Sequence, residues 1–492
     1  MRVALLVSLL IACSEPRAIT APKIDPLTVV TDRGAVVGSA GDGVRVFLGI
    51  PYAHADRWKP PGDVASWPTP RDATKPAPAC AQPDTGGFTR VSSEDCLTLN
   101  VWTPDGADRA PVMVWIHGGA FYQGAATDAI YDGAKLAKRT GVIVIGIEYR
   151  LGPLGWISRP SLGTNFGLLD QRAALAWVQR NARAFGGDPA RVTIFGESAG
   201  AWSVCAQLAM PGSRGLFARA IMQSGACADA LYFDQAAANA QGADFARAIG
   251  CDPDDDACMR AAPLDTIVHA MPFKRGLLLH PGVWWGPVVD GDTLPRVPLD
   301  AIARGESADV PLLIGWNEAE GVLHTLGFES VTPDELQGFV DEVFGAGASK
   351  ILARYDRPTP KDVLTDVVTD GIFACNDRRA ARAAFARGRT VFTYEWTHAL
   401  DDEKAHALGA THSVDLWFVF GNTDGGISLS EREQPLSKIV MDAWGNFARA
   451  GDPGWPAYST ARDTTHVLDL EPHDEAHVKQ DLCDAWDAIR RP

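Results

Sequence analysis

The sequence predicts an α/β fold, with a mostly parallel central sheet flanked by helices. Two runs, 111–116 and 142–147, are apolar at every position, which is typical of strands buried on both faces. Helical patterns with one apolar face, such as 168–182, separate the strand-like runs. Strands that alternate with helices favour parallel pairing, and functional loops then gather at the carboxyl ends of the strands.

Strand and helix patterns alternate along the whole chain. Strands are expected at 29–50, as hairpins, and at 97–102, 111–116, 142–147, 192–195, 219–223, 310–315 and 390–396. Helices are expected at 168–182, 199–210 and 436–447. In the last of these, Leu436, Ile439, Val440, Ala443, Trp444 and Phe447 recur at helical spacing, which predicts one buried face. Because both ends supply strands to one sheet, we expect a single domain over 26–492 with large insertions.

Composition argues against several classes of protein. The 492 residues are 46% hydrophobic, enough to bury a large core. The formal net charge of −16 makes nucleic acid an unexpected partner. After the N-terminal segment no run of 18 apolar residues occurs, which argues against a transmembrane bundle.

The N-terminus has the pattern of a targeting segment. A basic start is followed by an apolar run, and residues 10–13 (LIAC) resemble a bacterial lipobox. Residues 1–12 are therefore interpreted as a lipoprotein signal peptide, Cys13 as the lipidated residue and 13–25 as a tether. This predicts an exported protein of the bacterial cell envelope, held at a membrane only by lipid on Cys13. The alternative is ordinary signal cleavage with Cys13 incidental.

Export makes the remaining cysteines candidates for disulfides. Three pairings are proposed, and two cysteines are expected to be buried thiols. The pairings are Cys80–Cys96, Cys251–Cys258 and Cys375–Cys483, and the thiols are Cys205 and Cys227. No cysteine or histidine pair has zinc spacing, and the acidic run 254–256 lacks the calcium-loop pattern, so no metal is expected.

A Gly-x-Ser-x-Gly turn at 196–200 is the predicted centre of the chemistry. An apolar strand enters it and an apolar helix leaves it, the setting of a nucleophile elbow that exposes a serine hydroxyl. Ser198 is therefore the candidate nucleophile. The alternative is a plain glycine and serine loop.

A second glycine motif follows the buried strand at 111–116. The backbone N–H groups of Gly118 and Gly119, together with that of Ala199, could hold the oxyanion of a tetrahedral intermediate. A simple Gly-Gly turn is the alternative.

A nucleophilic serine needs a base and a carboxylate that orients the base. In α/β-hydrolases the chain order is serine, acid, histidine, each at a strand end. Glu320 and His412 fit that order. Spacing alone leaves His406 or His324 as competing bases and Asp290 or Asp370 as competing acids.

Taken together, these segments resemble the type-B carboxylesterase family, which includes the cholinesterases. The matching segments, in family order, are 49–53, 93–97, 117–121, 185–189 leading into the elbow, 223–225, 286–291, 317–321 and 412–421. The resemblance implies an α/β-hydrolase fold whose insertions form an active-site gorge. It implies Ser198, Glu320 and His412 as the catalytic triad, and Gly118, Gly119 and Ala199 as the oxyanion hole, with no cofactor. It also implies the three disulfide pairings, a hydrogen-bonded network of Ser224 and Asp415 behind the histidine, and Glu197 as a family feature beside the nucleophile.

The chain departs from the cholinesterases in one loop. Their loop between the first paired cysteines carries a tryptophan that stacks on choline, and 81–95 contains none, so choline selection there is not expected. We therefore expect an exported serine carboxylesterase that hydrolyses a small-molecule ester through an acyl-enzyme. Its activity should rise with pH as His412 loses a proton, with an apparent pKa of roughly 6 to 7. Amide, thioester or carbamate hydrolysis at the same site, or a catalytically silent surface binding or adhesion protein, are the alternatives. The natural ester and the oligomeric state are not predicted.

Overall fold

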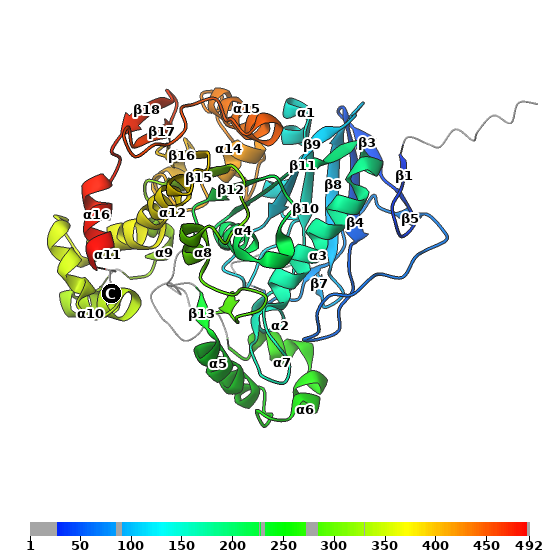
Figure 1. The fold of residues 1–492 in the computed structure, drawn as a ribbon, viewed down its shortest axis with the longest axis horizontal. Coiled ribbons are helices and arrows are strands. Elements are labelled where there is room, and N and C mark those ends of the chain that lie inside the picture. Colours follow the sequence, from blue (N-terminus) through cyan, green and yellow to red (C-terminus); the bar gives the residue numbers. More distant parts are fainter. Residues whose placement is uncertain are drawn as a thin grey trace, which may run out of the picture.

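A sheet of 11 strands organises the computed structural model, which describes residues 27–84, 91–225, 227, 232–271, 284–328 and 330–489. The strand order is β18-β17-β16-β15-β12-β11-β9-β10-β8-β4-β3 (Figure 1). From β17 to β10 every neighbouring pair is parallel, whereas β18 at one edge and β8, β4 and β3 at the other pair antiparallel. The predicted mostly parallel sheet is confirmed, and the hairpin of β3 and β4 forms its antiparallel edge together with β8.

The strands of this sheet lie close to the expected positions. Their bounds are β3 (Ser39–Gly41), β4 (Val44–Pro51), β8 (Thr98–Pro104), β9 (Ala110–Ile116), β10 (Ile143–Ile147), β11 (Gly187–Glu197), β12 (Arg219–Gln223), β15 (Leu312–Asn317), β16 (Val391–Trp396), β17 (Thr464–Leu468) and β18 (His473–Ala476). Smaller sheets pair β1 (Thr28–Val30), β2 (Ala35–Val37) and β5 (Arg71–Asp72), then β6 (Ala79–Cys80) with β7 (Ser92–Ser93), and β13 (Phe233–Asp234) with β14 (Val288–Val289).

Helices cover both faces of the sheet because its central strands are apolar on both sides. Every residue of β9 is buried, and alternate side chains enter different cores: Val112 and Val114 one, Met113 and Trp115 the other. The helices of the first core include α3 (Phe166–Asn181), α4 (Ala199–Ala209), α8 (Pro298–Arg304) and α12 (Cys375–Ala386). Those of the second are α1 (Ala134–Thr140), α14 (Leu416–Phe420) and α15 (Gln434–Ala450).

Two long insertions interrupt the alternation. Between β12 and β15 the chain adds α5 (Gln235–Ala248), α6 (Asp256–Ala261) and α7 (Leu264–His269), which project from the sheet at the bottom of Figure 1. Between β15 and β16 it adds α9 (Gly321–His324), α10 (Pro333–Phe344), α11 (Pro360–Val368) and the π-helical turn η7 (Thr369–Ala374) before α12. The C-terminal helix α16 (Gln480–Ile489) packs beside this second insertion (Figure 1).

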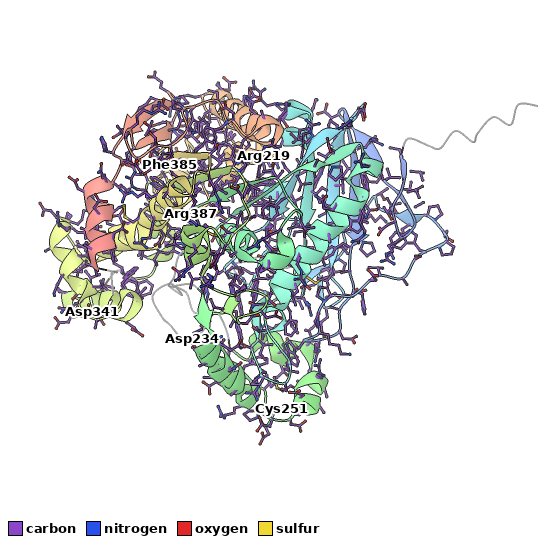
Figure 2. All side chains as sticks on the ribbon, in the orientation of Figure 1. Arg219, Asp234, Cys251, Asp341, Phe385 and Arg387 are labelled. Atoms are coloured by element: carbon purple, nitrogen blue, oxygen red, sulfur yellow. A yellow bond between two sulfur atoms is a disulfide. The ribbon has the colours of Figure 1, made fainter. Side chains whose placement is uncertain are left out.

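Four disulfides tie these parts together. Cys80–Cys96, Cys251–Cys258 and Cys375–Cys483 are bonded as proposed from the sequence. Figure 2 places Cys251 at the tip of the α5–α7 insertion. The expectation that Cys205 and Cys227 are buried thiols is wrong, because they form the fourth bond. Cys205 lies on α4 and Cys227 follows β12, and the packing of α4 on β12 brings their Cα atoms to 5.4 Å.

One residue of the predicted buried stripe on α15 faces solvent. Ile439 is 43% exposed, whereas Leu436, Val440 and Phe447 are buried. No helix in the described ranges is long and apolar enough to cross a bilayer. The predicted signal peptide 1–12, Cys13 and tether 13–25 lie outside the described residues.

Candidate active site

The candidate nucleophile occupies the sharp turn between β11 and α4. Ser198 has φ 55° and ψ −126°, a conformation that non-glycine residues adopt at a cost and that is found mainly at functional sites. Its backbone N–H donates to Gln223 O at 3.0 Å, which anchors the turn to β12. The flanking Gly200 has no room for a side chain, since a Cβ would lie 2.0 Å from Ile116 O. The structure therefore has the strand-turn-helix setting that the motif predicted.

The glycine loop after β9 packs directly against this turn. A Cβ on Gly118 would lie 3.3 Å from the Cβ of Ser198 and 2.8 Å from Glu197 Oε2, so only glycine allows the approach. Gly119 has φ 102°, a conformation that favours glycine. Within the described residues neither glycine N–H donates to a protein acceptor, and Ala199 opens α4, where backbone N–H groups have no intrahelical partner. The structure brings the three candidate oxyanion donors to the region of Ser198.

His412 and Glu320 meet although 92 residues separate them. The Nδ1 atom of His412 lies 2.6 Å from Glu320 Oε2, and both side chains are buried. The other carboxylate oxygen of Glu320 accepts from the backbone N–H of Asn317 at 2.7 Å. Asn317 also donates through Nδ2 to Thr411 O, so β15 and the His412 loop hold each other in place. This pairing fixes the ring orientation and directs Nε2 away from Glu320.

The Nε2 atom of His412 faces the nucleophile turn. Its nearest ionisable neighbour is Glu197 Oε1 at 3.2 Å, and Glu197 immediately precedes Ser198. Glu197 Oε1 also accepts from Ser413 Oγ at 2.5 Å. No hydrogen bond from Ser198 to Nε2 is made in the described structure, which leaves this nitrogen available. Bonds of this kind commonly form only when substrate binds.

A buried polar network that includes Asp415 lies behind the histidine, but no hydrogen bond joins the Ser224 hydroxyl to Asp415 in the described residues. Asp415 Oδ2 accepts from Gln223 Nε2 at 2.8 Å and from Tyr394 OH at 3.4 Å. Gln223 in turn accepts from Trp444 Nε1 at 3.0 Å. Ser224, next in the chain, is fully buried and its N–H donates to Gly315 O at 2.8 Å. The network joins β12, β16 and α15 beneath the site.

Burial controls the charges of these groups. It lowers the pKa of His412 to about 4, opposed by Asp415, and raises the pKa of Glu320 to about 8, opposed by Asn317 and Ser224. Burial also raises the pKa of Asp415 to about 6 and lifts the pKa of Glu197 well above its usual value, with a further increase from Asp415. His412 is therefore neutral near pH 7, the state in which it can accept a proton.

The alternative bases and acids that spacing left open bind other groups, except for His324. His406 Nδ1 lies 2.9 Å from Leu400 O. Asp290 accepts from Asn165 Nδ2 at 2.9 Å, and Asp370 is bound by Tyr355 and Lys479. His324 is different, because its ring centroid lies 4.8 Å from that of His412.

Aromatic rings form a continuous wall around the site, and Trp202, Phe121 and Phe373 in it were not assigned from the sequence. Trp202, in the first turn of α4, contacts Trp284 and Phe373, and Phe373 contacts both His324 and His412. Phe121 of the glycine loop closes the wall against Trp202 and Trp284. The signals in the sequence were the positions of Trp202 and Phe121 next to motif residues and of Trp284 just before the segment 286–291.

One cluster has the composition of a metal site but is already satisfied by the protein. His398, Asp401 and Glu433 offer ligand atoms within 4.8 Å of one another. Glu433 accepts from His398 Nε2 at 3.0 Å and from the backbone N–H of Asp401 at 2.8 Å, and Asp401 binds Arg432. Because these atoms bind one another, we interpret the cluster as a structural network.

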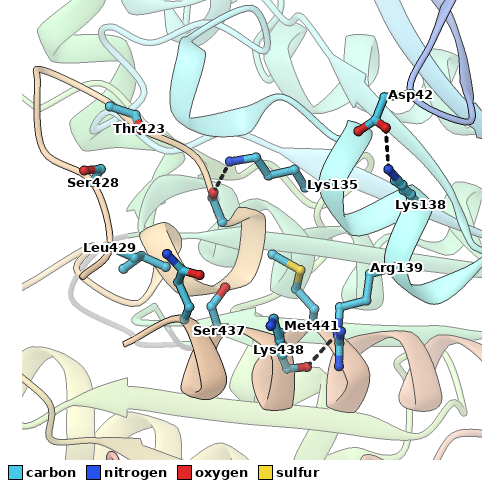
Figure 3. A pocket seen from close by; sticks show the side chains of 12 residues that line it. Asp42, Lys135, Lys138, Arg139, Thr423, Ser428, Leu429, Ser437, Lys438 and Met441 are labelled. Atoms are coloured by element: carbon cyan, nitrogen blue, oxygen red, sulfur yellow. Dashed lines mark hydrogen bonds and ion pairs between the residues drawn. The ribbon is translucent and has the colours of Figure 1, made fainter. Parts of the chain in front are cut away.

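A surface groove of about 750 Å³ lies between α1 and α15, and none of the candidate triad residues lines it (Figure 3). Lys135 donates to Gly421 O, Lys138 pairs with Asp42, and Arg139 donates to Lys438 O. Most of its cationic groups are thus engaged with other parts of the protein.

Comparison with known proteins gives the same assignment as the fold. A model of the carboxylesterase family matches residues 25–486. A para-nitrobenzyl esterase of Bacillus subtilis (strain 168) is 37% identical over 476 residues, which cover 90% of this chain and 95% of that protein. The crystal protein of Dictyostelium discoideum is 35% identical over 459 residues, covering 87% of this chain and 82% of that protein.

Solved esterase structures superimpose on nearly the whole length of this chain. A PNB esterase superimposes with a TM-score of 0.85 at 34% identity, covering 93% of this chain and 99% of its own. A carboxylesterase of Geobacillus stearothermophilus, solved at pH 6.2, superimposes with a TM-score of 0.84 at 33% identity, covering 94% of this chain and 100% of its own. The chain therefore belongs to the carboxylesterase family and is a carboxylic ester hydrolase with the α/β-hydrolase fold.

Proposed function

We propose that this protein is an exported serine carboxylesterase that hydrolyses small-molecule esters through an acyl-enzyme on Ser198. The observation that carries the proposal is the contact of 2.6 Å between His412 and Glu320, with the other ring nitrogen directed to the turn that holds Ser198. A binding or adhesion module has no need for such an arrangement at a strained serine.

The first half of the reaction acylates the enzyme. His412 Nε2 takes the proton of Ser198 as Oγ attacks the ester carbonyl carbon, and the N–H groups of Gly118, Gly119 and Ala199 bind the resulting oxyanion. The carbonyl then re-forms, the bond to the alkoxy oxygen breaks, and His412 gives its proton to the departing alcohol. Glu320 stabilises the imidazolium in both steps.

The second half repeats the sequence with water. His412 removes a proton from water, the hydroxide attacks the acyl carbon, and Ser198 leaves with the proton returned by His412. The products are a carboxylic acid and the free enzyme, and no external reductant or oxidant is consumed. The para-nitrobenzyl esterases among the relatives make aromatic esters suitable first substrates.

Covalent labelling tests the proposal. An organophosphate should bind stoichiometrically to Ser198, as mass spectrometry of the peptide that contains 196–200 would show, and should abolish hydrolysis of a para-nitrobenzyl ester. Ser198→Ala should remove both the label and roughly 10⁴-fold or more of the activity. Retention of near-wild-type turnover by Ser198→Ala, or labelling at another residue, would refute the assignment.

We also propose that Cys13 carries lipid and anchors the protein in the cell envelope. The four disulfides support export, because such bonds persist in oxidising compartments. In a bacterial host that processes lipoproteins, the wild-type chain should incorporate labelled palmitate and sediment with membranes, whereas Cys13→Ser should do neither. Equal membrane association of both forms would contradict the anchor.

A further inference from the structure

A second imidazole packs against the candidate general base. His324 ends α9, four residues after Glu320, and its ring lies 4.8 Å from the ring of His412. The ring of Phe373 stacks on His324 at 5.5 Å with an interplanar angle of 16° and contacts His412 at 4.9 Å. The three rings touch one another, so His324 belongs to the wall of the site.

The polar edge of His324 is unsatisfied. Its Nε2 is buried and has no hydrogen-bond partner in the described structure, although the side chain as a whole is partly exposed. His398 and His406 differ in this respect, since His398 bonds Glu433 and His406 bonds Leu400 O. A neutral imidazole always carries one donor and one acceptor nitrogen. A buried polar atom without a partner is destabilising, a cost that phenylalanine in the same space would not have.

The position of the ring identifies the part of the substrate that it would meet. In the proposed mechanism His412 gives its proton to the departing alcohol, so a side chain packed against the His412 ring borders the alcohol portion of the ester. The wall continues from His324 through Phe373 to Trp202, which lies one turn beyond Ser198. The indole N–H groups of Trp202 and Trp284 in this wall also lack partners in the described structure, but an indole can only donate. The imidazole of His324 can both donate and accept.

The charge state of His324 suits a hydrogen bond rather than an ion pair. Burial, followed by the neighbouring His412, lowers the pKa of His324 well below its ordinary value. The ring is neutral near pH 7, so it adds no positive charge beside His412 when His412 becomes imidazolium. A neutral imidazole can donate to or accept from a hydroxyl group.

We propose that His324 is a specificity-determining residue that hydrogen-bonds to a hydroxyl group on the departing alcohol, so that esters of diols or polyols are the preferred class of substrate. The inference rests on the proposed function of the triad. It goes further by naming the chemistry of the alcohol.

A matched pair of esters tests it. Propyl butyrate and 2-hydroxyethyl butyrate share the acyl group and differ only by a methyl in place of a hydroxyl group. His324→Phe keeps an aromatic ring and removes both nitrogens. It should lower kcat/KM for the hydroxyethyl ester about tenfold and for the propyl ester less than twofold, the size expected for one neutral hydrogen bond. His324→Gln, which restores a donor and an acceptor, should recover part of the lost preference.

Each outcome is decisive. An equal loss on both esters, or no loss on either, overturns the proposal and leaves His324 as a packing residue. A loss confined to an ester with its hydroxyl on the acyl chain, tested as ethyl 4-hydroxybutyrate against ethyl butyrate, overturns the assignment to the alcohol side. Failure of the proposed function looks different, because the wild-type protein would then hydrolyse neither ester, whatever the residue at 324.

Discussion

His412 Nδ1 and Glu320 Oε2 lie 2.6 Å apart in a site where both side chains are almost completely buried. An isolated buried charge on either group is unfavourable, and the pKa values of both shift toward the neutral forms. A positive charge that develops on His412 during catalysis is stabilised only by a partner at this distance. The rate of acylation should therefore depend on the Glu320 carboxyl group.

Replacing that carboxyl group tests the dependence. Glu320→Gln keeps the shape of the side chain but cannot stabilise the imidazolium, and the change should lower kcat by roughly 10³–10⁴. The matched control is Asp290→Asn, an acid that spacing alone could not exclude, which should stay within about threefold of the wild type. Nitrophenyl ester kinetics, with melting temperatures of both variants, would provide the measurement. If kcat fell further in Asp290→Asn than in Glu320→Gln, Asp290 rather than Glu320 would be the triad acid.

The pH dependence should reflect the buried histidine. The base works only when neutral, so activity is lost as pH falls through the pKa of His412 in the folded protein. Burial lowers the pKa of His412 to about 4. Activity should therefore fall at a lower pH than the apparent pKa of 6 to 7 that an ordinary histidine predicts. The value of kcat/KM should fall below about pH 5, where His412 becomes protonated. Intrinsic fluorescence must show that the fold persists there, and a midpoint near 6.5 would contradict the shift.

The oxyanion loop should not tolerate a methyl group at 118. In Gly118→Ala the new Cβ would lie 2.8 Å from Glu197 Oε2 and 3.0 Å from Glu197 O, so the loop must move away from Ser198. Displacing a backbone donor should lower kcat by about 10²–10³. Gly41→Ala is the control, because nothing lies within 4 Å of a Cβ at that exposed strand position. Equal activity of the two variants would rule out the role of the loop.

The disulfides should differ in their effect on stability because they close loops of different length. Cys375–Cys483 spans 108 residues and Cys251–Cys258 spans 7. From loop-closure entropy, removing the first by a double serine substitution should cost ~4.8 kcal/mol and removing the second ~2.4 kcal/mol. Chemical denaturation of both double variants provides the comparison. The expectation is contradicted if removing Cys251–Cys258 lowers the free energy of unfolding more than removing Cys375–Cys483 does.

The fold was predictable because its signals are local. Runs such as those of β9 and β10 are apolar throughout because both faces are covered, and the buried stripe of α15 follows helical spacing. Ile439 is an exception, since helical spacing marks one face of α15 but does not show which position on it stays exposed. The antiparallel edge strands followed from the hairpin pattern at 29–50.

The site was predictable only in part. The turn at Ser198 and the glycines at 118 and 119 are short motifs whose steric demands can be recognised in the sequence. Spacing could not choose among His324, His406 and His412, and resemblance to a family was needed to prefer the last. Phe373, which contacts His412 in the aromatic wall, was missed because it comes from a π-helical turn in an insertion, where no motif marks it.

The sequence by itself determined the order of strands and helices, the nucleophile turn and the family, because each depends on residues close together in the chain. The tertiary structure alone decided that Glu320 meets His412, that Cys205 bonds Cys227, and that His324 packs beside the general base. These contacts depend on how α4, α9 and the insertions pack on the sheet. Their geometry is set by the packing of many side chains at once, and no short segment of sequence contains it.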